Sequence, residues 1–173
     1  MKKLQIGCGL DYKDGWVNLD FNKEIKADVY HDLNKKLPFK ENEFDYILMD
    51  NVLEHLDTER VISIIQELHK ITKPNGIIEI YTPHYKGCFA FPLLTHRSFY
   101  GIGKFDSYTK GGVKSGERYG SALFEIEEKL YFFLKDFRFP NFIFNFGRIY
   151  QRLMEKFNPF GFDEIRYRMK VIK

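Results

Sequence analysis

The sequence predicts an α/β fold built on a mainly parallel sheet. Three observations support this. Short apolar strands near the start of the chain each end in a glycine or an acid, and a strand, a helix and a strand follow one another between residues 44 and 81. The last segment of the chain is a predicted strand in which apolar and basic residues alternate. Strand–helix–strand order is typical of parallel sheets with helices packed on them.

Composition favours one ordinary globular domain over residues 1–173, because 44% of the residues are hydrophobic and 29% are charged. The net charge of +3 is too small to indicate nucleic acid or a membrane as partner. Cys8 and Cys88 are too few for a disulfide framework and lack metal-ligand spacing. We therefore expect a reduced, cytoplasmic protein without a metal site. No stretch is long and apolar enough for a transmembrane segment.

Four short strands are expected in the first fifty residues. They cover Leu4–Ile6, Trp16–Asp20, Ala27–Asp32 and Phe44–Met49. The fourth is apolar almost throughout, as expected of a strand buried on both faces. Only about ten residues separate the glycines after the first strand from the end of the second, too few for a full crossover helix.

One long helix is expected after the fourth strand. Asp57 or Thr58 can cap its start, and apolar residues recur at helical spacing as far as Ile71. His69 is expected to face solvent. The segment Lys73–Gly76 ends the helix, because its proline cannot continue the hydrogen-bond ladder. A fifth strand follows over Ile77–Tyr81.

The second half of the chain is less regular. Gly101–Gly120 lacks periodicity and is expected to form a long loop. Strands are expected over Phe124–Lys135 and Ile165–Lys173. Between them, an amphipathic helix is predicted by Phe142, Phe146, Ile149, Tyr150, Leu153 and Phe157. The region Phe137–Phe162 mixes aromatic and basic residues: a core or homodimer-forming helix is favoured, and a nucleic-acid stacking platform or a membrane-interface helix are the alternatives.

Three successive strand ends carry polar groups or glycines. They are Gly7–Gly9, Asp20 and Asp32, and the carboxyl ends of parallel strands share one edge of a sheet. Glycines let a ligand approach the backbone. The first acid can accept both hydroxyls of a ribose, and the second can accept the amino group of adenine. The pattern predicts an adenosine-bearing ligand; the alternatives are a plain glycine turn, a strand cap at Asp20, and a turn with Asn34 capped by Asp32.

The ligand at these strand ends is not expected to be a dinucleotide. The six-residue glycine fingerprint is incomplete, since Gly9 is followed by no third glycine at the right spacing. Asp11 and Asp14 would repel a phosphate. A cofactor that carries adenosine without phosphate fits better, and S-adenosylmethionine is the common one.

Seven segments then form a recognisable series: Leu4–Gly9, Gly15–Asp20, Asp32–Leu33, Leu37–Phe39, Phe44–Ile47, Val52–His55 and Lys73–Gly76. In this order, over residues 4–83, they resemble a methyltransferase type 11-like branch of the class I S-adenosylmethionine-dependent methyltransferases. The resemblance implies a Rossmann-like methyltransferase fold with a mostly parallel seven-stranded sheet and an antiparallel last strand. Here the first helix is expected to be reduced to a short connection.

The resemblance also implies which residues contact the cofactor. Carried over by motif, they are Gly7, Cys8, Gly9, Asp20, Asp32, Leu33, Asp50 and Asn51. The glycine turn with its cysteine would line the methionine part through backbone groups, and Asp20 would hold the ribose. Asp32 with Leu33 would hold the adenine edge. Asp50 or Asn51 would face the ammonium and the reacting methyl.

Methyl transfer to a neutral oxygen or nitrogen needs proximity and a base that removes the acceptor's proton. The candidate bases are His84, just after the fifth strand, and His96. His31 and His55 are weaker candidates. His55 in particular lies at the start of a helix, where a histidine is more often a packing residue.

The predicted function is methyl transfer from S-adenosylmethionine to a small-molecule or glycan-like acceptor. Residues 1–83 would bind the cofactor, while residues 84–173 would supply an acceptor loop at Tyr85–Tyr119, a helix and the terminal strand pair. A nucleic-acid amino-methyltransferase is disfavoured, because Asp50-Asn51-Val52 lacks the expected proline pair. The alternative is a methyltransferase-like fold that serves as a non-catalytic partner-binding module.

Overall fold

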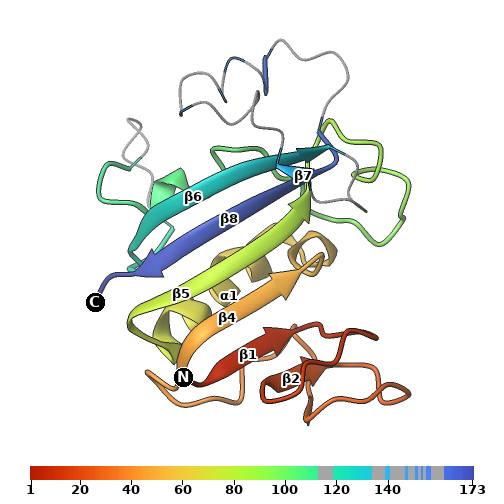
Figure 1. Cartoon of the computed structure of the whole chain (residues 1–173), viewed down its shortest axis with the longest axis vertical. Helices are drawn as coiled ribbons and strands as arrows, with labels where there is room; N and C mark the ends of the chain where they lie inside the picture. Colours follow the sequence, from red (N-terminus) through yellow and green to blue (C-terminus); the bar gives the residue numbers. More distant parts are fainter. Residues whose placement is uncertain are drawn as a thin grey trace.

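A single mixed sheet organises the molecule (Figure 1). The computed structural model describes residues 1–112, 119–133, 139–140, 147, 151, 153, 155–156 and 162–173. Within them the strand order is β3-β2-β1-β4-β5-β8-β6-β7. The arrowheads of β1, β4 and β5 point the same way, so their carboxyl ends share one edge.

The first four strands run parallel and lie where the sequence predicts them. They are β1 (Lys3–Ile6), β2 (Val17–Asp20), β3 (Val29–Tyr30) and β4 (Phe44–Asp50). The third is shorter than expected. Asp28 leaves the strand pattern because its carboxylate accepts hydrogen bonds from the backbone and side-chain N–H groups of Asn18, at 2.7 and 2.9 Å. The connection between β1 and β2 contains turns and no helix, which confirms the reduced first helix.

Helix α1 (Thr58–Ile71) is the one long helix of the described residues, and its apolar stripe packs on the sheet. Asp57 is the N-cap residue by position, but its side chain makes no capping bond. Instead, Asp57 Oδ2 accepts a hydrogen bond from Arg97 at 3.0 Å. The expected solvent exposure of His69 is wrong: its ring packs edge-on against Phe124, and Nε2 lies 2.9 Å from the carbonyl oxygen of Ile172.

Strand β5 (Thr72–Pro83) begins as soon as α1 ends, five residues earlier than the sequence suggests. The helix stops where predicted, but Lys73–Gly76 lies within the strand as an irregular stretch. Thr72 pairs with Phe44, and the next partners are Ile77 and Tyr46. The extra residues bulge out, with Asn75 in the left-handed region at φ 62°.

The final strands complete the sheet. β8 (Glu164–Val171) is antiparallel to both β5 and β6 (Phe124–Phe133). Its predicted alternation is confirmed, because Ile165, Tyr167, Met169 and Val171 are fully buried. The expected antiparallel last strand is therefore present, and the two-residue β7 (Phe139–Pro140) adds an eighth strand at the edge.

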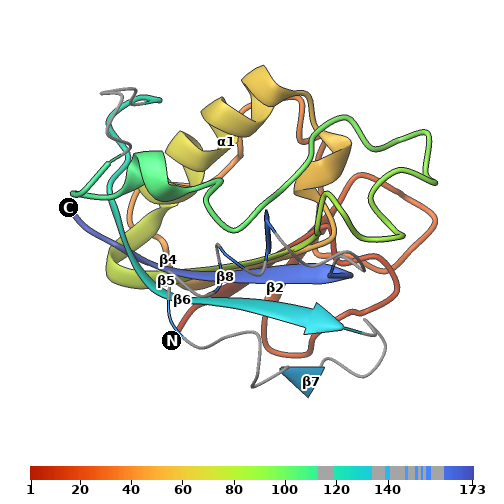
Figure 2. The same ribbon diagram turned by 90° about the horizontal axis from the view of Figure 1, so that it is seen from above.

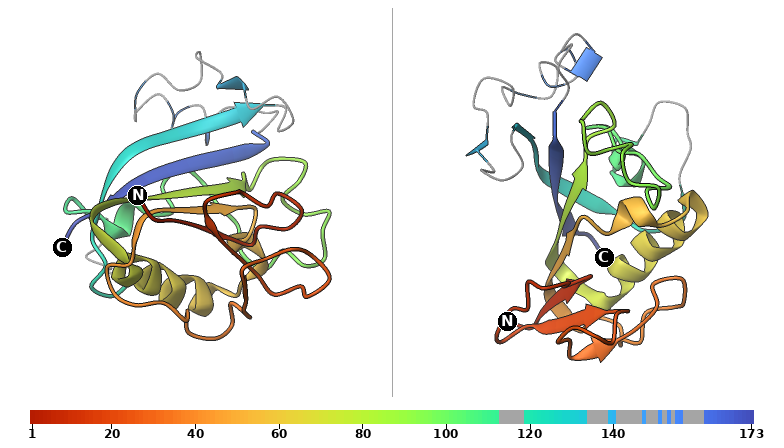
Figure 3. Two further views of the ribbon diagram at one scale, coloured as in Figure 1. Left: turned by 60° about the horizontal axis from the view of Figure 1, so that its bottom comes forward. Right: turned by 90° about the vertical axis from the view of Figure 1, so that its right-hand side faces the viewer.

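One face of the sheet is covered by α1 and by the segment between β5 and β6 (Figure 2). Figure 3 shows the same layering from two further directions. The segment contains a short helix, η2 (Asp106–Tyr108), and buries Tyr100, Ile102 and Phe105 in the main core. The described residues 101–112 of the predicted loop therefore contribute to the core. The opposite face carries ion pairs such as Glu79–Arg168 and a small apolar cluster.

Most of the predicted amphipathic helix lies outside the described residues. Phe142, Phe146, Ile149, Tyr150 and Phe157 belong to that part, while Leu153 is described as helical. The homodimer surface expected there thus stays a prediction. No helix in the described portions of the chain is long and apolar enough to span a membrane.

Candidate functional site

A glycine turn follows β1 at the carboxyl edge. The N–H groups of Gly7 and Cys8 donate to the carbonyl oxygen of Leu19 at 2.7 and 3.1 Å, which ties the turn to β2. Gly7 has φ 69°, and a Cβ there would lie 2.4 Å from Val52 Cγ2. Gly9 has φ 52°, and a Cβ there would meet nothing within 4 Å. Position 7 thus requires glycine for close packing, and position 9 faces open space.

Asp20 lies against this turn, as the sequence predicts. Its carboxylate is nearly buried and accepts the N–H of Gly9 at Oδ2 and the N–H of Asn22 at Oδ1, both at 2.9 Å. Each oxygen of a carboxylate has a second acceptor position. Asp20 therefore holds the turn and can still accept hydrogen bonds from a ligand. A role as a strand cap and a role in ligand binding are thus compatible.

Asp32 follows β3 at the same edge and is exposed. Its Oδ1 accepts hydrogen bonds from the backbone and side-chain N–H groups of Asn34, at 2.9 and 3.0 Å. The backbone bond lowers the pKa of the Asp32 carboxyl. Asp32 thus caps a turn with Asn34, as the alternative reading has it. Leu33 is half-buried and packs on the core, and the adenine contact of these two residues stays a prediction.

Cys8 is buried beneath the turn, with Sγ 3.8 Å from the carbonyl oxygen of Lys26. Burial, and then the nearby charge of Asp20, raise the pKa of its thiol. A protonated thiol is a poor nucleophile. Cys8 is therefore suited to lining the turn and unsuited to covalent catalysis.

The end of β4 presents a polar cluster that joins three strands. Asn51 has φ 53°, and its Nδ2 donates to Asp50 Oδ1 at 2.7 Å and to Glu164 Oε1 at 3.2 Å. Glu164 is fully buried at the start of β8, where it pairs with Pro83. Asn51 Oδ1 is buried and has no hydrogen-bond partner among the described residues. A donor from a ligand would satisfy it.

His84 is enclosed. It is fully buried, its Nε2 lies 3.1 Å from Glu155 Oε1, and the rings of Tyr131 and Phe162 pack edge-on against it. The N–H of Lys86 donates to Nδ1 at 3.3 Å. Both ring nitrogens of His84 are thus occupied within the protein, and no face of the ring is open to an acceptor.

His96 lies in a more open place, beside the 3-10 helix η1 (Leu53–His55) that follows β4. Its ring meets that of His55 edge-on, with centroids 4.9 Å apart. Burial, and then the neighbouring His96, lower the pKa of His55. Buried Glu54 is the third member of a cluster whose potential ligand atoms all lie within 4.8 Å of one another.

Sequence reasoning missed several residues at this edge. Glu164 and Asn51 are 113 positions apart, so no local spacing could connect them. Glu54 and His96 are likewise brought together only by folding, so no sequence spacing could reveal their cluster with His55. Phe21 is 76% exposed directly after Asp20. In the sequence, the aromatic residue directly after the strand-ending acid was the signal that could have indicated Phe21 as a ligand contact, since exposed apolar side chains often mark binding sites.

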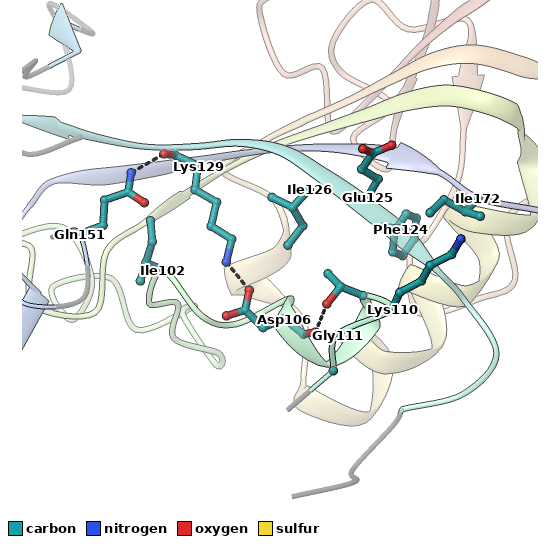
Figure 4. Close-up of a pocket in the computed structure, with 12 residues that line it drawn as sticks. Ile102, Asp106, Lys110, Gly111, Phe124, Glu125, Ile126, Lys129, Gln151 and Ile172 are labelled. Atoms are coloured by element: carbon teal, nitrogen blue, oxygen red, sulfur yellow. Dashed lines mark hydrogen bonds and ion pairs between the residues drawn. The ribbon is translucent and has the colours of Figure 1, made fainter. Parts of the chain in front are cut away.

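A well-formed cavity lies elsewhere (Figure 4). It has a volume of about 680 Å³ and is lined by Asp106, Phe124, Lys129 and Gln151, among others. Because β6 runs parallel to β5, Phe124 lies at the amino edge of the sheet. The cavity is therefore remote from the strand ends that carry Gly7, Asp20 and Asp50, and it is no part of the predicted site.

Comparisons with known proteins agree with this geometry. Residues 5–80 match a family model described as a methyltransferase domain. No curated protein sequence matches the chain. Among solved structures, a SAM-dependent methyltransferase from Archaeoglobus fulgidus aligns with 98% of this chain and 85% of its own length, at 17% identity and a TM-score of 0.65.

Two further structures share the fold. An S-adenosylmethionine-dependent methyltransferase from Mesorhizobium loti covers 98% of this chain and 90% of its own, at 17% identity and a TM-score of 0.56. A chain from a complex of the Haloferax volcanii Trm112 methyltransferase activator covers 99% of this chain and 83% of its own, at 13% identity and a TM-score of 0.62. The resemblance and the fold class expected from the sequence are confirmed.

Proposed function

We propose that the chain, which has a methyltransferase fold and matches a methyltransferase domain over residues 5–80, is an S-adenosylmethionine-dependent enzyme that methylates an oxygen or nitrogen of a small-molecule or glycan-like acceptor. The observation that carries the proposal is the contact between the glycine turn and Asp20. It joins a backbone open to a ligand with a carboxylate that can accept two hydroxyls.

The strand ends fit this cofactor in three respects. Gly9 faces open space beside Asp20, where a ribose would lie. Phe21 offers an exposed ring next to that position for an adenine. Asn51 Oδ1, a buried acceptor that no described residue satisfies, suits an ammonium donor. These contacts would place the cofactor along the ends of β1, β2 and β4.

S-adenosylmethionine supplies an electrophilic methyl group when it is bound. The protein's part is to hold the acceptor in line with it and to take up the acceptor's proton. His84 is unsuited to take up that proton, because it is fully enclosed and bonded to Glu155. His84 instead positions the acceptor segment: Glu155 Oε1 also accepts the N–H of Ile102, at 2.9 Å.

The acceptor site would be formed by residues 85–119. Exposed apolar side chains gather in one stretch of this segment: Phe89, Phe91, Leu93, Leu94 and Phe99. Phe91 and Phe99 stack with centroids 4.7 Å apart. An acceptor with an apolar part beside its reacting hydroxyl or amine would cover this surface.

The same apolar stretch favours the second candidate, a non-catalytic partner-binding module. Contiguous exposed apolar side chains often mark protein–protein contacts. The two functions differ in what they require of Asp20. An enzyme needs its carboxylate for the cofactor, whereas a partner-binding surface at residues 89–99 does not.

Calorimetric titration with S-adenosylmethionine and with its demethylated product separates the two. We expect micromolar binding that weakens about a hundredfold in Asp20→Ala, because charge-assisted hydrogen bonds contribute about 1.5–3 kcal/mol each. Asp20→Asn keeps one acceptor oxygen for the glycine turn and serves if the alanine variant unfolds. Asp14→Ala, an exposed acid of the same loop, is the matched control and should bind normally. Absence of binding to the unmodified protein would favour the module.

A further inference from the structure

A cluster of two imidazoles and one carboxylate lies immediately beyond the predicted cofactor site. Glu54 and His55 belong to η1, which follows the Asp50–Asn51 end of β4, and His96 comes from the segment after β5. Their potential ligand atoms all lie within 4.8 Å of one another. We propose that Glu54, His55 and His96 bind a divalent transition-metal ion at the acceptor side of the site.

The backbone around the cluster is held in place by long-range hydrogen bonds. The carbonyl oxygen of Glu54 accepts the N–H groups of Arg97 and Ser98, at 2.7 and 3.2 Å. The hydroxyls of Ser98 and Tyr100 both lie within 3.2 Å of the carbonyl oxygen of Leu53. The residues that follow His96 are therefore attached to η1, so the two histidines are brought together by the fold itself.

The hydrogen bond of the His96 ring leaves one of its nitrogens available as a ligand. His96 Nδ1 lies 2.9 Å from the carbonyl oxygen of Ala90, so Nδ1 carries the proton and Nε2 holds the lone pair. Metal-binding histidines commonly donate their second ring N–H to a carbonyl in this way, which fixes the tautomer and the ring orientation.

The donor set indicates the class of ion. Two imidazoles with one carboxylate suit zinc and neighbouring transition metals, whereas magnesium and calcium prefer oxygen ligands alone. Ligand atoms around a tetrahedral zinc ion lie about 3.3 Å apart, so the three side chains must close on the ion. The carboxylate is buried while His55 is exposed, which gives the ion a route from solvent.

Three protein ligands leave at least one coordination position for another molecule, as in catalytic zinc sites. Placing the acceptor's oxygen or nitrogen at that position rests on the proposed methyl transfer. The binding of the ion itself does not, because it depends only on the three side chains.

The test is calorimetric titration of the chelator-treated, untagged protein with Zn²⁺, together with the visible absorption of Co²⁺ bound in its place. We expect one ion per chain and competition between the two metals, but no displacement by excess Mg²⁺. His96→Ala and His55→Ala should each weaken zinc binding by more than the roughly ten- to hundredfold that loss of a ligand's hydrogen-bond partner costs. His31→Ala, a histidine outside the cluster, should bind zinc normally.

Binding of one zinc ion per chain, weakened in His96→Ala and in His55→Ala, supports the site. No saturable zinc binding, or zinc binding unchanged in both His96→Ala and His55→Ala, would overturn it. His55 is exposed, so His55→Ala keeps the test decisive if His96→Ala fails to fold. Titration of the zinc-free protein with S-adenosylmethionine is a separate measurement. Absence of S-adenosylmethionine binding in that titration would count against the proposed function and would not affect the conclusion about zinc.

Discussion

The two halves of the chain place their functional groups by different means. In residues 1–83, strand ends put them together over short sequence distances: Gly9 and Asp20 are 11 positions apart. In residues 84–173, long-range packing does so: His84 and Glu155 are 71 positions apart, and Tyr167 and Gly101 are 66. The first kind of site depends on backbone conformation, and the second depends on buried aromatic packing.

The largest expected effect concerns the backbone of the first half. Gly7→Ala adds a Cβ at 2.4 Å from Val52 Cγ2 and forces a left-handed φ on alanine. Left-handed strain costs about 1–2 kcal/mol and overpacking about 1–3 kcal/mol. We expect the free energy of unfolding, measured in urea, to fall by about 3 kcal/mol, and S-adenosylmethionine binding to be lost with the turn.

Two variants sharpen this result. Gly15→Ala shares the left-handed φ, at 76°, but its Cβ would meet nothing within 4 Å, so it should lose only about 1 kcal/mol. Val52→Ala makes room beside position 7, and the double variant should recover the overpacking part alone. Equal losses in Gly7→Ala and Gly15→Ala would show that close packing at Val52 is unimportant.

This contrast explains why much of the first half could be predicted from its sequence. Strand periodicity, the Gly7–Gly9 turn and the strand-ending acids are local signals, and the structure places the turn and Asp20 together. Local signals were weaker where a tertiary contact competes. Asp57 bonds to Arg97 instead of capping α1, and the Lys73–Gly76 turn became a bulge because β5 pairs with β4 from its first residue.

The second half shows what local patterns omit. Gly101–Gly120 looks polar and irregular, yet two of its own side chains, Phe105 and Tyr108, are buried in the core. His84 follows a strand end and resembles a catalytic base by position alone. The rings of Tyr131 and Phe162 that enclose it lie more than forty positions away in the sequence, so no local spacing could predict this enclosure.

The second prediction tests the packed half. Tyr167 is fully buried, and its hydroxyl donates to the carbonyl oxygen of Gly101 at 2.6 Å. Tyr167→Phe leaves that carbonyl without its donor, so we expect a loss of about 1–2 kcal/mol in urea unfolding. Tyr30→Phe is the control, since the Tyr30 hydroxyl bonds to Ile25 at an exposed position where water can replace it. A cost in Tyr30→Phe as large as that in Tyr167→Phe would contradict this account.

The third prediction concerns Asn51, where the two halves meet through Glu164. Asn51→Gly removes the side-chain amide and tolerates φ 53°, whereas Asn51→Ala removes the amide and adds left-handed strain. Both should weaken S-adenosylmethionine binding about tenfold, the value of one hydrogen bond of about 1.4 kcal/mol. The alanine variant should unfold about 1 kcal/mol more easily than the glycine variant. Unchanged affinity in Asn51→Gly would remove the amide from the cofactor site.

The smallest expected effect is a pH dependence that links the halves, because His69 on α1 contacts Phe124 on β6 and the carbonyl of Ile172. Burial lowers the pKa of His69 below its ordinary 6.5. The unfolded chain therefore binds the proton more tightly, and the contribution of His69 to stability is complete above pH 6.5 and declines as the pH falls from there to the folded pKa. His69→Gln retains a donor for Ile172 but cannot titrate. Urea unfolding at a series of pH values should show the wild type losing more stability than the variant below pH 6.5, with parallel curves above it. Parallel curves throughout would mean that this contact does not distinguish the two protonation states, and that the packing between α1 and the C-terminal strands is looser than its geometry indicates.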